Sequence, residues 1–413
     1  MTTDAPIEPS SIPDDLQERY SRWKKNTKLL YSYLNTNTSK WPSLTCQFFP
    51  DLDTTTDTHR ILLSTFTSSQ LPEDESLYIA NLSTSNHLNW SSLNNFDMDE
   101  MEFKPDNSTK FPSKNLNVDI SIPFPNGDCN RARYLPQNPD LLAAASSNGS
   151  IYIFNRTKHG SRRLNSNQRS FEARLYSTDK MDENFTNSNE AVSIAWNLQK
   201  NGTLASSYSQ GSIKIWDITK YSCSDPTLRE NELTIPFDPE GCNEVTWMVN
   251  HDSIFAACSE SNKLSLFDVR TKEEMLKMTE NIGTHSGGIN SCKFNYYNDM
   301  LLASADSTGK INMWDIRKLD KEPIKSFNHN SSISTLEWNP NLETILVTAG
   351  QDDGLVKIWD TANGQNIFVH GGHMLGVNDV SWDLHDPWLL SSVSNDNSIH
   401  VWKPATNLVD IES

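Results

Sequence analysis

The 413-residue sequence predicts an all-β fold, a seven-bladed β-propeller with one α-helix packed on its side. Three observations predict it: a turn-and-strand phrase that is written six times, an aromatic residue at a nearly fixed distance before each copy, and one stretch of helical period near the N-terminus. Along the chain we expect a flexible N-terminus at 1–13, a helix at 14–35, the propeller at 41–404 and a C-terminal tail at 405–413.

The helix is predicted by spacing. Residues at intervals of three and four form one mostly apolar helix face, namely Leu16, Tyr20, Trp23, Thr27, Leu30 and Leu34. Asp14 and Asp15 place negative charge in the first turn, where it suits the helix dipole. The opposite face is basic, because it carries Arg22, Lys24, Lys25 and Lys28. The apolar face therefore needs a partner surface.

Each copy of the repeated phrase is a turn followed by a strand of alternating apolar residues that ends in Trp or Phe. Gly or Asn opens the turn, because a tight turn often requires a positive φ. The six copies are "GSIYIF" from 149, "GSIKIW" from 211, "NKLSLF" from 262, "GKINMW" from 309, "GLVKIW" from 354 and "NSIHVW" from 397.

An aromatic residue precedes the copies by 15 positions, or by 16 in the case of Trp338; the others are Tyr134, Trp196, Trp247, Phe294 and Trp382. We interpret the tryptophans at these two repeat positions as structural anchors. The copies recur every 43 to 62 residues, and the tightest spacing fits a four-stranded WD40 blade. Strand-like runs at 44–130 supply a seventh blade and a strand that closes the ring and so removes exposed strand edges.

Three histidines, at 285, 329 and 373, lie nine residues before the first aromatic of their blades. Two blades also place an acid six residues before the final Trp, which gives the sets His329, Asp353, Trp359 and His373, Asp396, Trp402. We interpret these sets as buried hydrogen-bond networks, and not as metal or catalytic sites. The blade that ends at Trp314 has Thr308 at the acidic position, so we expect a weaker network there.

The chain carries 35 Lys and Arg against 53 Asp and Glu, a formal net charge of −18. This balance disfavours direct, sequence-specific binding to nucleic acid and favours basic protein partners. No run approaches the roughly 20 apolar residues of a membrane helix, and no signal peptide is recognisable. We therefore expect an intracellular protein that has no membrane partner.

No catalytic motif is found, since H-E-x-x-H, Walker and G-x-S-x-G sequences do not occur. The six cysteines form no C-x-x-C pair, which argues against a zinc knuckle and a disulfide framework. The sequence thus predicts no metal, no cofactor and no enzyme activity. An interaction scaffold is the expected function class.

Several long phrases resemble one known family: "YSRWKKNTKLLYSYL…WPSLTCQFFPD", "NRARYLPQNP", "TKHGS" and "HGGHMLGVNDVSWDLHDPW". They are similar to the retinoblastoma-associated family of histone-binding WD40 proteins, over about residues 12 to 404. "SSLNNFDMDEMEFKP" and "ASADSTGKINMWDIR" most resemble the fungal members that form the small subunit of chromatin assembly factor 1. The resemblance implies a nuclear scaffold, with a cytoplasmic pool left open. It would bind histones H3 and H4 and larger subunits of that complex during replication-coupled nucleosome assembly.

The family resemblance also implies two histone sites. The first helix of histone H4 would lie in a groove between the N-terminal helix and the loop before the last blade, lined by Leu29, Leu30, Tyr33, Leu34, Phe368 and Val369. Family members usually carry a longer acidic loop before "HGGH", whereas "DTANGQNIFVHGGH" runs directly from Asp360 to His370. This difference predicts a shallower groove and a reduced affinity.

The second implied site is an acidic mouth of the central channel, which would accept the basic tail of histone H3. Glu190 matches one acid of the family. Glu244 lies one position from another, where this chain has Asn243, and Asp119 falls near an acidic strand.

Other functions stay open from the sequence. A related paralogue serves histone acetyltransferase complexes, and copurification distinguishes it from the assembly-factor protein. "NMWDIR" (312–317) and "LFDVR" (266–270) resemble the WD-x-R motif of substrate receptors for cullin ubiquitin ligases. The basic stretch 157–169 is expected to be a solvated loop, with a role in nuclear import left open.

Overall fold

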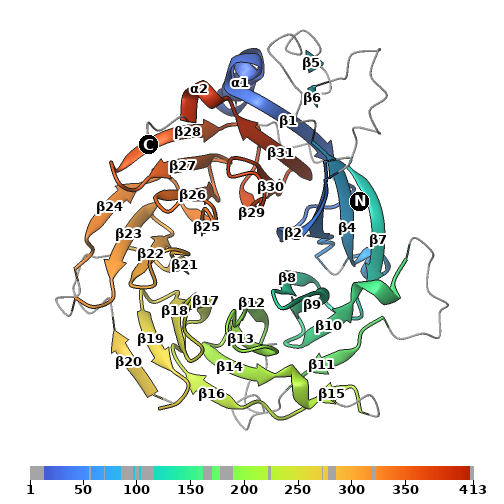
Figure 1. The fold of residues 1–413 in the computed structure, drawn as a ribbon, viewed down its shortest axis with the longest axis vertical. Coiled ribbons are helices and arrows are strands. Elements are labelled where there is room, and N and C mark those ends of the chain that lie inside the picture. The colour runs from blue at the N-terminus through green and yellow to red at the C-terminus, as the bar shows by residue number, and fades with distance from the viewer. Residues whose placement is uncertain are drawn as a thin grey trace, which may run out of the picture.

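The structure is a computed structural model, and it describes residues 14–54, 57–68, 70–84, 96–97, 102–103, 116–160, 170–176, 189–221, 225–271, 273–277, 285–318 and 322–409. Seven sheets stand around a central channel, each with one strand at the channel and three or more strands further out (Figure 1). The predicted seven-bladed propeller is confirmed.

Blades 1 to 3 are formed by the first part of the chain. From the channel outward, blade 1 contains β2 (Cys46–Asp53), β3 (Thr58–Ser64), β4 (Ser76–Ser83) and β7 (Asn117–Pro123). Blade 2 contains β8 (Cys129–Leu135), β9 (Asn138–Ser146), β10 (Ile151–Asn155) and β11 (Ala173–Leu175). Blade 3 contains β12 (Ala191–Trp196), β13 (Thr203–Tyr208), β14 (Ser212–Asp217) and β16 (Leu233–Pro236).

Blades 4 to 7 complete the ring. Blade 4 contains β17 (Cys242–Trp247), β18 (Ile254–Ser259), β19 (Leu264–Asp268) and β20 (Glu273–Lys277). Blade 5 contains β21 (Ile289–Phe294), β22 (Leu301–Asp306), β23 (Lys310–Asp315) and β24 (Lys325–Asn328). Blade 6 contains β25 (Ile333–Trp338), β26 (Ile345–Gly350), β27 (Val356–Asp360) and β28 (Gln365–His370). Blade 7 contains β29 (Val377–Trp382), β30 (Leu390–Ser394), β31 (Ser398–Pro404) and β1 (Tyr31–Thr38).

Short elements decorate the ring. These are η1 (Pro72–Asp74), η3 (Arg156–Lys158), η5 (Ile218–Lys220), the two-stranded pair β5 (Phe96–Asp97) and β6 (Glu102–Phe103), and β15 (Thr227–Leu228), which pairs in parallel with β11. The expected tail at 405–413 begins with a short helix, α2 (Thr406–Val409), whose Val409 is buried. No helix in the described part of the chain is long and apolar enough to cross a membrane.

The turn chemistry predicted for the repeat is confirmed. All six residues that open the repeated phrase have a positive φ, between 65° and 90°: Gly149, Gly211, Asn262, Gly309, Gly354 and Asn397. Glycine adopts this conformation without a steric penalty, and asparagine tolerates it better than most other residues. The turns that separate the two middle strands of these blades therefore depend on these residue types.

The N-terminal helix is shorter than predicted. Helix α1 runs from Asp14 to Leu30, and the chain then becomes β1, which is antiparallel to β31 with Leu34 opposite Trp402. The sequence "YSYLNTNT" is rich in Tyr, Asn and Thr, which are weak helix formers, and Tyr and Thr favour strands. The predicted helix boundary at 35 is therefore wrong. The strand that closes the ring is β1, and not a strand from 44–130.

The strand-end tryptophans join neighbouring blades, which confirms them as structural anchors. Each indole Nε1 donates a hydrogen bond to a backbone carbonyl on the inner strand of the preceding blade: Trp196 to Arg133 (3.1 Å), Trp247 to Ala195 (3.0 Å), Trp338 to Lys293 (3.1 Å) and Trp382 to Glu337 (3.4 Å). A buried indole needs such a partner. The repeat spacing therefore records contacts between blades.

The two predicted His–Asp–Trp sets do come together within their blades. In blade 7 the Trp402 indole donates to the Ser392 hydroxyl (3.2 Å), which lies 2.7 Å from His373 Nε2, and the Asp396 carboxylate joins through Ser398. In blade 6 Thr348 takes the place of the serine: it bridges Trp359 (2.9 Å) and His329 (2.8 Å), and Asp353 lies 3.5 Å from His329. The bridging hydroxyl was missed in the sequence, although it stands 10 or 11 residues before each Trp.

The prediction for the blade that ends at Trp314 is wrong. Its acid is Asp306 and not position 308: the Asp306 carboxylate lies 2.9 Å from His285 Nδ1 and accepts from the backbone N–H of Thr308 (2.9 Å). Ser304 bridges His285 (2.7 Å) and Trp314 (2.8 Å). Hydrogen bonds with His285 and Thr308 help to lower the pKa of Asp306 to about 2, although burial acts to raise it. This network is complete.

Five cysteines lie within the described residues, and all five are buried free thiols: Cys46, Cys129, Cys242, Cys258 and Cys292. Burial raises the pKa of the Cys46 and Cys242 thiols well above the ordinary value, which keeps them protonated and unreactive. Cys223 lies outside the described residues, as do 1–13 and most of the basic stretch 157–169.

Candidate functional site

Helix α1 is attached to the ring through one buried tryptophan. Trp23 is 6% exposed, and its ring packs between Tyr31 of β1, His370 of β28 and His400 of β31. The indole Nε1 donates to the Tyr31 hydroxyl (2.7 Å), which lies 2.8 Å from His370 Nδ1, and His370 Nε2 lies 3.0 Å from His400 Nδ1. These contacts join the helix to the last two blades.

The order of donors fixes the tautomers in this chain of hydrogen bonds. The Tyr31 hydroxyl accepts from Trp23 and has its own proton available for His370 Nδ1; with this assignment His370 is protonated on Nε2, which donates to His400. Both histidines are neutral in this arrangement. Burial and the nearby histidines lower the pKa of His370 and His400 well below the ordinary value.

The second glycine of the "HGGH" motif, Gly372, makes room for the helix. A Cβ at Gly372 would lie 2.7 Å from the Trp23 ring and 2.8 Å from His400, so only glycine fits there. The guanidinium of Arg19 adds a polar clamp, because it donates to the carbonyl oxygens of Asp353 and of His373 (3.1 Å). The motif that resembles the family thus serves to dock α1 on the propeller.

His370, His373 and His400 bring possible metal-ligand atoms within 4.8 Å of one another. The hydrogen bonds of the network use these atoms instead, since both nitrogens of His373 lie next to serine hydroxyls (2.6 and 2.7 Å) and His370 contacts Tyr31 and His400. Burial lowers the pKa of His373 to about 4, which keeps it neutral at pH 7. The cluster acts as packing and hydrogen bonding for the helix.

Of the residues predicted for a groove beside the helix, some are accessible to a ligand and others are buried in the fold. Leu29 (69% exposed) and Val369 (40% exposed) face solvent, and Leu30 is half-buried against the core. Phe368 and Leu34 are buried, and Tyr33 packs on the opposite side of β1 against the core shared by blades 7 and 1. Leu34 was misplaced because it lies on a strand, so it does not share a helix face with Leu30.

Two apolar residues beside Leu29 and Val369 were not predicted. Ile367 is half-buried on β28, and Leu408 is 41% exposed on α2. The start of α2 is tied to the end of α1, since the N–H of Ala405 donates to the carbonyl of Leu30 (2.8 Å). Figure 1 shows α1, α2 and β28 next to one another. We name the set Leu29, Leu30, Ile367, Val369 and Leu408 the α1–β28 edge.

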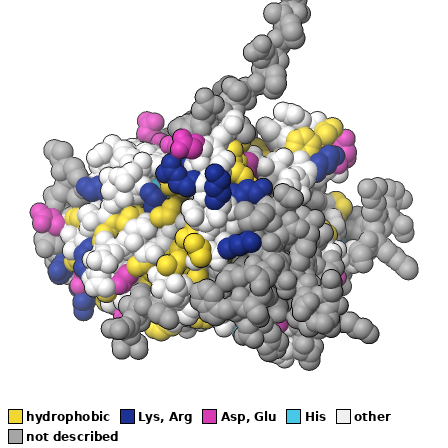
Figure 2. Space-filling model, turned by 90° about the horizontal axis from the view of Figure 1, so that it is seen from above, with side chains coloured by type: hydrophobic (Ala, Val, Ile, Leu, Met, Phe, Trp, Pro, Cys, Tyr) yellow, Lys and Arg dark blue, Asp and Glu magenta, His cyan; other side chains and the backbone are white. Residues whose placement is uncertain are grey.

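The charge around this edge is positive. Arg22, Lys25 and Lys28 of α1 are exposed, and Figure 2 shows a band of Lys and Arg side chains beside hydrophobic ones on this side of the molecule. β27 and β28 are joined directly by the four residues 361–364, so no acidic loop projects over the edge. This edge therefore offers a ligand apolar contacts with cations beside them, and no carboxylates from the β27–β28 connection.

The three acids predicted for the channel mouth do not lie together. Glu190 is half-buried directly before β12, with its backbone paired to Ser209 of the β13–β14 turn. Glu244 is 2% exposed inside the channel, where it lies 2.7 Å from Lys293 and accepts from the backbone N–H of Cys292 (2.9 Å). Its pKa is lowered, because these partners outweigh the effect of burial. Asp119 lies on β7, the outermost strand of blade 1, 3.7 Å from Arg60.

Two exposed acids at the Glu190 mouth were not predicted. Glu260 lies in the turn between β18 and β19, and its carboxylate accepts from the Asn243 amide (3.0 Å). Asp352 is exposed in the corresponding turn between β26 and β27. Glu190, Glu260 and Asp352 thus come from blades 3, 4 and 6, and we name them the acidic mouth. These acids could have been found from the sequence, because each lies in or beside a turn at the same end of its blade.

The two WD-x-R-like sequences form local ion pairs. Arg270 lies 2.6 Å from Asp268, and Arg317 lies 2.7 Å from Asp315. These short pairs order the turn after the third strand of blades 4 and 5, and hydrogen bonding with Arg317 lowers the pKa of Asp315 to about 2. A structural role thus accounts for both sequences.

Comparison with known proteins agrees with this geometry. Residues 18–86 match the family model of the histone-binding protein RBBP4, which also describes a component of the CAF1 complex. The match contains α1 except for its first turn, together with β1 and the first three strands of blade 1. The chain is 62% identical over 411 residues to the histone-binding protein MSI1 of Saccharomyces cerevisiae, with 97% of each chain covered. The chain belongs to this family of histone-binding WD40 proteins. The resemblance seen in the sequence is thereby confirmed.

Two further family models match other parts of the propeller. Residues 230–383 match the N-terminal domain of nucleolar protein 10-like proteins, and residues 364–403 match the WD domain, G-beta repeat. Both matches fall on blades, so they reflect the repeat architecture. The RBBP4 and CAF1 family match covers three strands of blade 1 as well, but it also covers α1 and β1, which the other two matches do not reach.

Proposed function

We propose that this protein is a histone H3–H4-binding scaffold subunit of chromatin assembly factor 1. The observation that supports this most is the 62% identity to MSI1, which extends over 97% of both chains and so includes α1 and all seven blades. Deposition of histones on newly replicated DNA is the process it would serve. The nucleus is the proposed location, and the scaffold acts without a catalytic step of its own.

The first helix of histone H4 would bind at the α1–β28 edge. Leu29 and Val369 are exposed apolar residues on two elements that the Trp23 contacts hold in place, so the surface is formed before the ligand arrives. An amphipathic helix binds such a surface through apolar residues spaced three and four apart. Because the contact residues are apolar, we expect binding there to depend less on salt than binding through charged groups does.

The basic tail of histone H3 would bind at the acidic mouth. Glu190, Glu260 and Asp352 place carboxylates on three blades around one end of the channel, and the net charge of −18 adds a favourable field for a cationic peptide. Exposed charges interact through solvent, so this binding should weaken steeply as salt is added. The two histone sites can therefore be told apart by their salt dependence.

The experiment that tests the assignment is a native pull-down of the tagged full-length chain followed by mass spectrometry. We expect histones H3 and H4 together with the larger subunits of chromatin assembly factor 1. Recovery of a histone acetyltransferase in place of the assembly subunits would assign the chain to the related complex. A cullin adaptor without histones would overturn the proposal.

A further inference from the structure

The end of the channel opposite to the acidic mouth carries a ring of apolar side chains. Each inner strand carries an aromatic residue at the repeat position, which is Phe48 in blade 1. The residue two positions after this aromatic is apolar in every blade, namely Pro50, Pro136, Leu198, Val249, Tyr296, Pro340 and Leu384. Six of these residues, all except Pro50, line one cavity of about 190 Å³ in the channel. We name the seven residues the collar.

The collar is partly exposed, since Pro136, Tyr296 and Leu384 are exposed and the other four residues are half-buried. Tyr296 and Leu384 are each 37% exposed, and the adjacent Tyr297 is 53% exposed. Exposed apolar patches on soluble proteins commonly mark interaction sites. Three of the seven positions are proline, whose fixed φ makes the rim rigid and reduces the entropy lost on binding.

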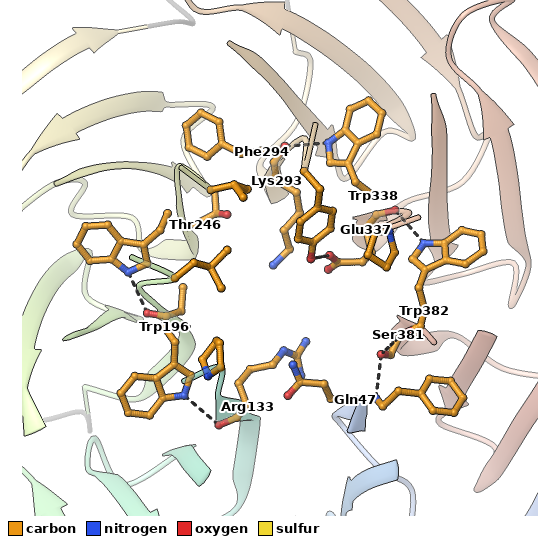
Figure 3. A pocket seen from close by; sticks show the side chains of 18 of the residues that line it. Gln47, Arg133, Trp196, Thr246, Lys293, Phe294, Glu337, Trp338, Ser381 and Trp382 are labelled. Carbon is orange, nitrogen blue, oxygen red and sulfur yellow. Dashed lines mark hydrogen bonds between the residues drawn. The ribbon is translucent and has the colours of Figure 1, made fainter. Parts of the chain in front are cut away.

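Inside the collar the channel is lined by a layer of polar and charged residues. Six of the seven inner strands contribute one polar or charged residue each to this layer, and blade 3 contributes Ala195. Figure 3 shows the six around the opening: Gln47, Arg133, Thr246, Lys293, Glu337 and Ser381. Both cations already have carboxylate partners, because Arg133 lies 3.0 Å from Asp379 and Lys293 lies 2.7 Å from Glu244. An incoming anion would have to compete with these buried ion pairs.

Glu337 differs from the other charged members of this layer. Within the described part of the chain its hydrogen-bonding partner is the Tyr296 hydroxyl, which donates to Oε1 at 2.9 Å, so Oε2 is left as an acceptor in the channel. Burial raises the pKa of Glu337, whereas the neighbouring cations Lys293 and Arg133 favour its ionised form, and an ionised carboxylate can accept several hydrogen bonds. A cationic side chain that enters through the collar would meet this oxygen, while its aliphatic part would lie along apolar residues.

We propose that the collar end of the channel binds an extended segment of a partner protein, which inserts one lysine or arginine side chain to reach Glu337 and packs apolar neighbours on Tyr296 and Leu384. The cavity is smaller than the roughly 300–1,000 Å³ of small-molecule sites, which suits a single long side chain. The inner strands are six to eight residues long, so the two channel ends are about 20 Å apart. A histone tail at the acidic mouth would leave this site free, and the proposal does not depend on histone binding.

The test is a selection from a displayed library of random 12-residue peptides on the full-length protein, with counter-selection on the Glu337→Gln variant. We expect the enriched peptides to carry Lys or Arg next to apolar residues. A synthetic peptide with an enriched sequence should bind at least tenfold more weakly to the Glu337→Gln and Leu384→Ser variants of the protein. The same loss is expected when the Lys or Arg of the peptide is replaced by methionine. Glu190→Gln, at the opposite mouth, is the matched control and should leave the affinity unchanged.

Two results would overturn the proposal. The first result is that the selected peptides carry Asp or Glu, in place of Lys or Arg, at the peptide position whose contribution is lost on Glu337→Gln. This result would mean that the channel accepts an anion. The second result is that no selected peptide loses affinity on both Glu337→Gln and Leu384→Ser, although both variants melt close to the wild-type temperature. This result would mean that the collar is not a peptide site. Leu384 is exposed, so its replacement leaves the blade core intact.

Discussion

Replacing Leu29 and Val369 together by serine should abolish most of the affinity for the first helix of histone H4. Leu29 is 69% exposed and Val369 is 40% exposed, so the change removes little from the folded core. Full burial of such a side chain contributes about 1.5–3 kcal/mol. Scaled by the exposed fractions, a ligand that covers both would gain about 1–2 kcal/mol from Leu29 and about 0.6–1.2 kcal/mol from Val369.

The sum of about 1.6–3.2 kcal/mol corresponds to a loss of roughly 15- to 200-fold in affinity. The assay is fluorescence anisotropy with a labelled peptide of the H4 helix, together with a thermal melt of each variant. Leu71→Ser is the matched control, because Leu71 is a leucine that is 37% exposed beside η1 on blade 1. A double variant that melts like the wild type and binds the peptide equally well would refute the assignment of the α1–β28 edge.

Three further predictions concern charge and stability. Glu190→Lys with Glu260→Lys should weaken a histone H3 tail peptide at least tenfold at low salt and much less at high salt, with an unchanged melting temperature; equal binding at low salt would exclude the acidic mouth. Because the folded pKa of His373 is about 4 and the unfolded value is about 6.5, the unfolded state binds more protons between these values. The free energy of unfolding should therefore fall by up to about 3 kcal/mol from pH 7 to pH 4 through this group, measured by urea unfolding, and a flat profile over that range would contradict the buried neutral state. Asp306→Ala should destabilise the fold by about 1–3 kcal/mol, since it leaves His285 without its carboxylate, whereas Thr308→Ala should cost less; the reverse order would make position 308 the more important member of that network.

The repeats made the blades predictable because each blade uses the same local chemistry. A positive φ at Gly or Asn and an aromatic at the end of the inner strand are needed in every copy, so they are visible in one sequence. The end of α1 was not predictable in the same way. Leu30 and Leu34 keep a helical spacing, and pairing with β31, almost 370 residues away, decides that Leu34 lies on a strand.

The site was only partly predictable for the same reason. Leu29 and Val369 were identified through the family resemblance and are exposed, but the exposed neighbour Leu408 follows the last blade and has no repeat signal. Glu244 was misplaced because adjacent residues of a strand point in different directions, so one position separates the Asn243 side chain at the mouth from a buried ion pair. Glu260 reaches Asn243 from a turn 17 residues further along the chain.

The most direct test of the central claim is hydrogen–deuterium exchange of the full-length protein with and without histones H3–H4. The account predicts slower exchange in α1 and β28 at the α1–β28 edge, at Glu190 directly before β12 and in the β18–β19 turn that carries Glu260, with the collar end unchanged. Histone binding that leaves α1 and both of these acidic segments unprotected, or no binding by the folded protein, would contradict it.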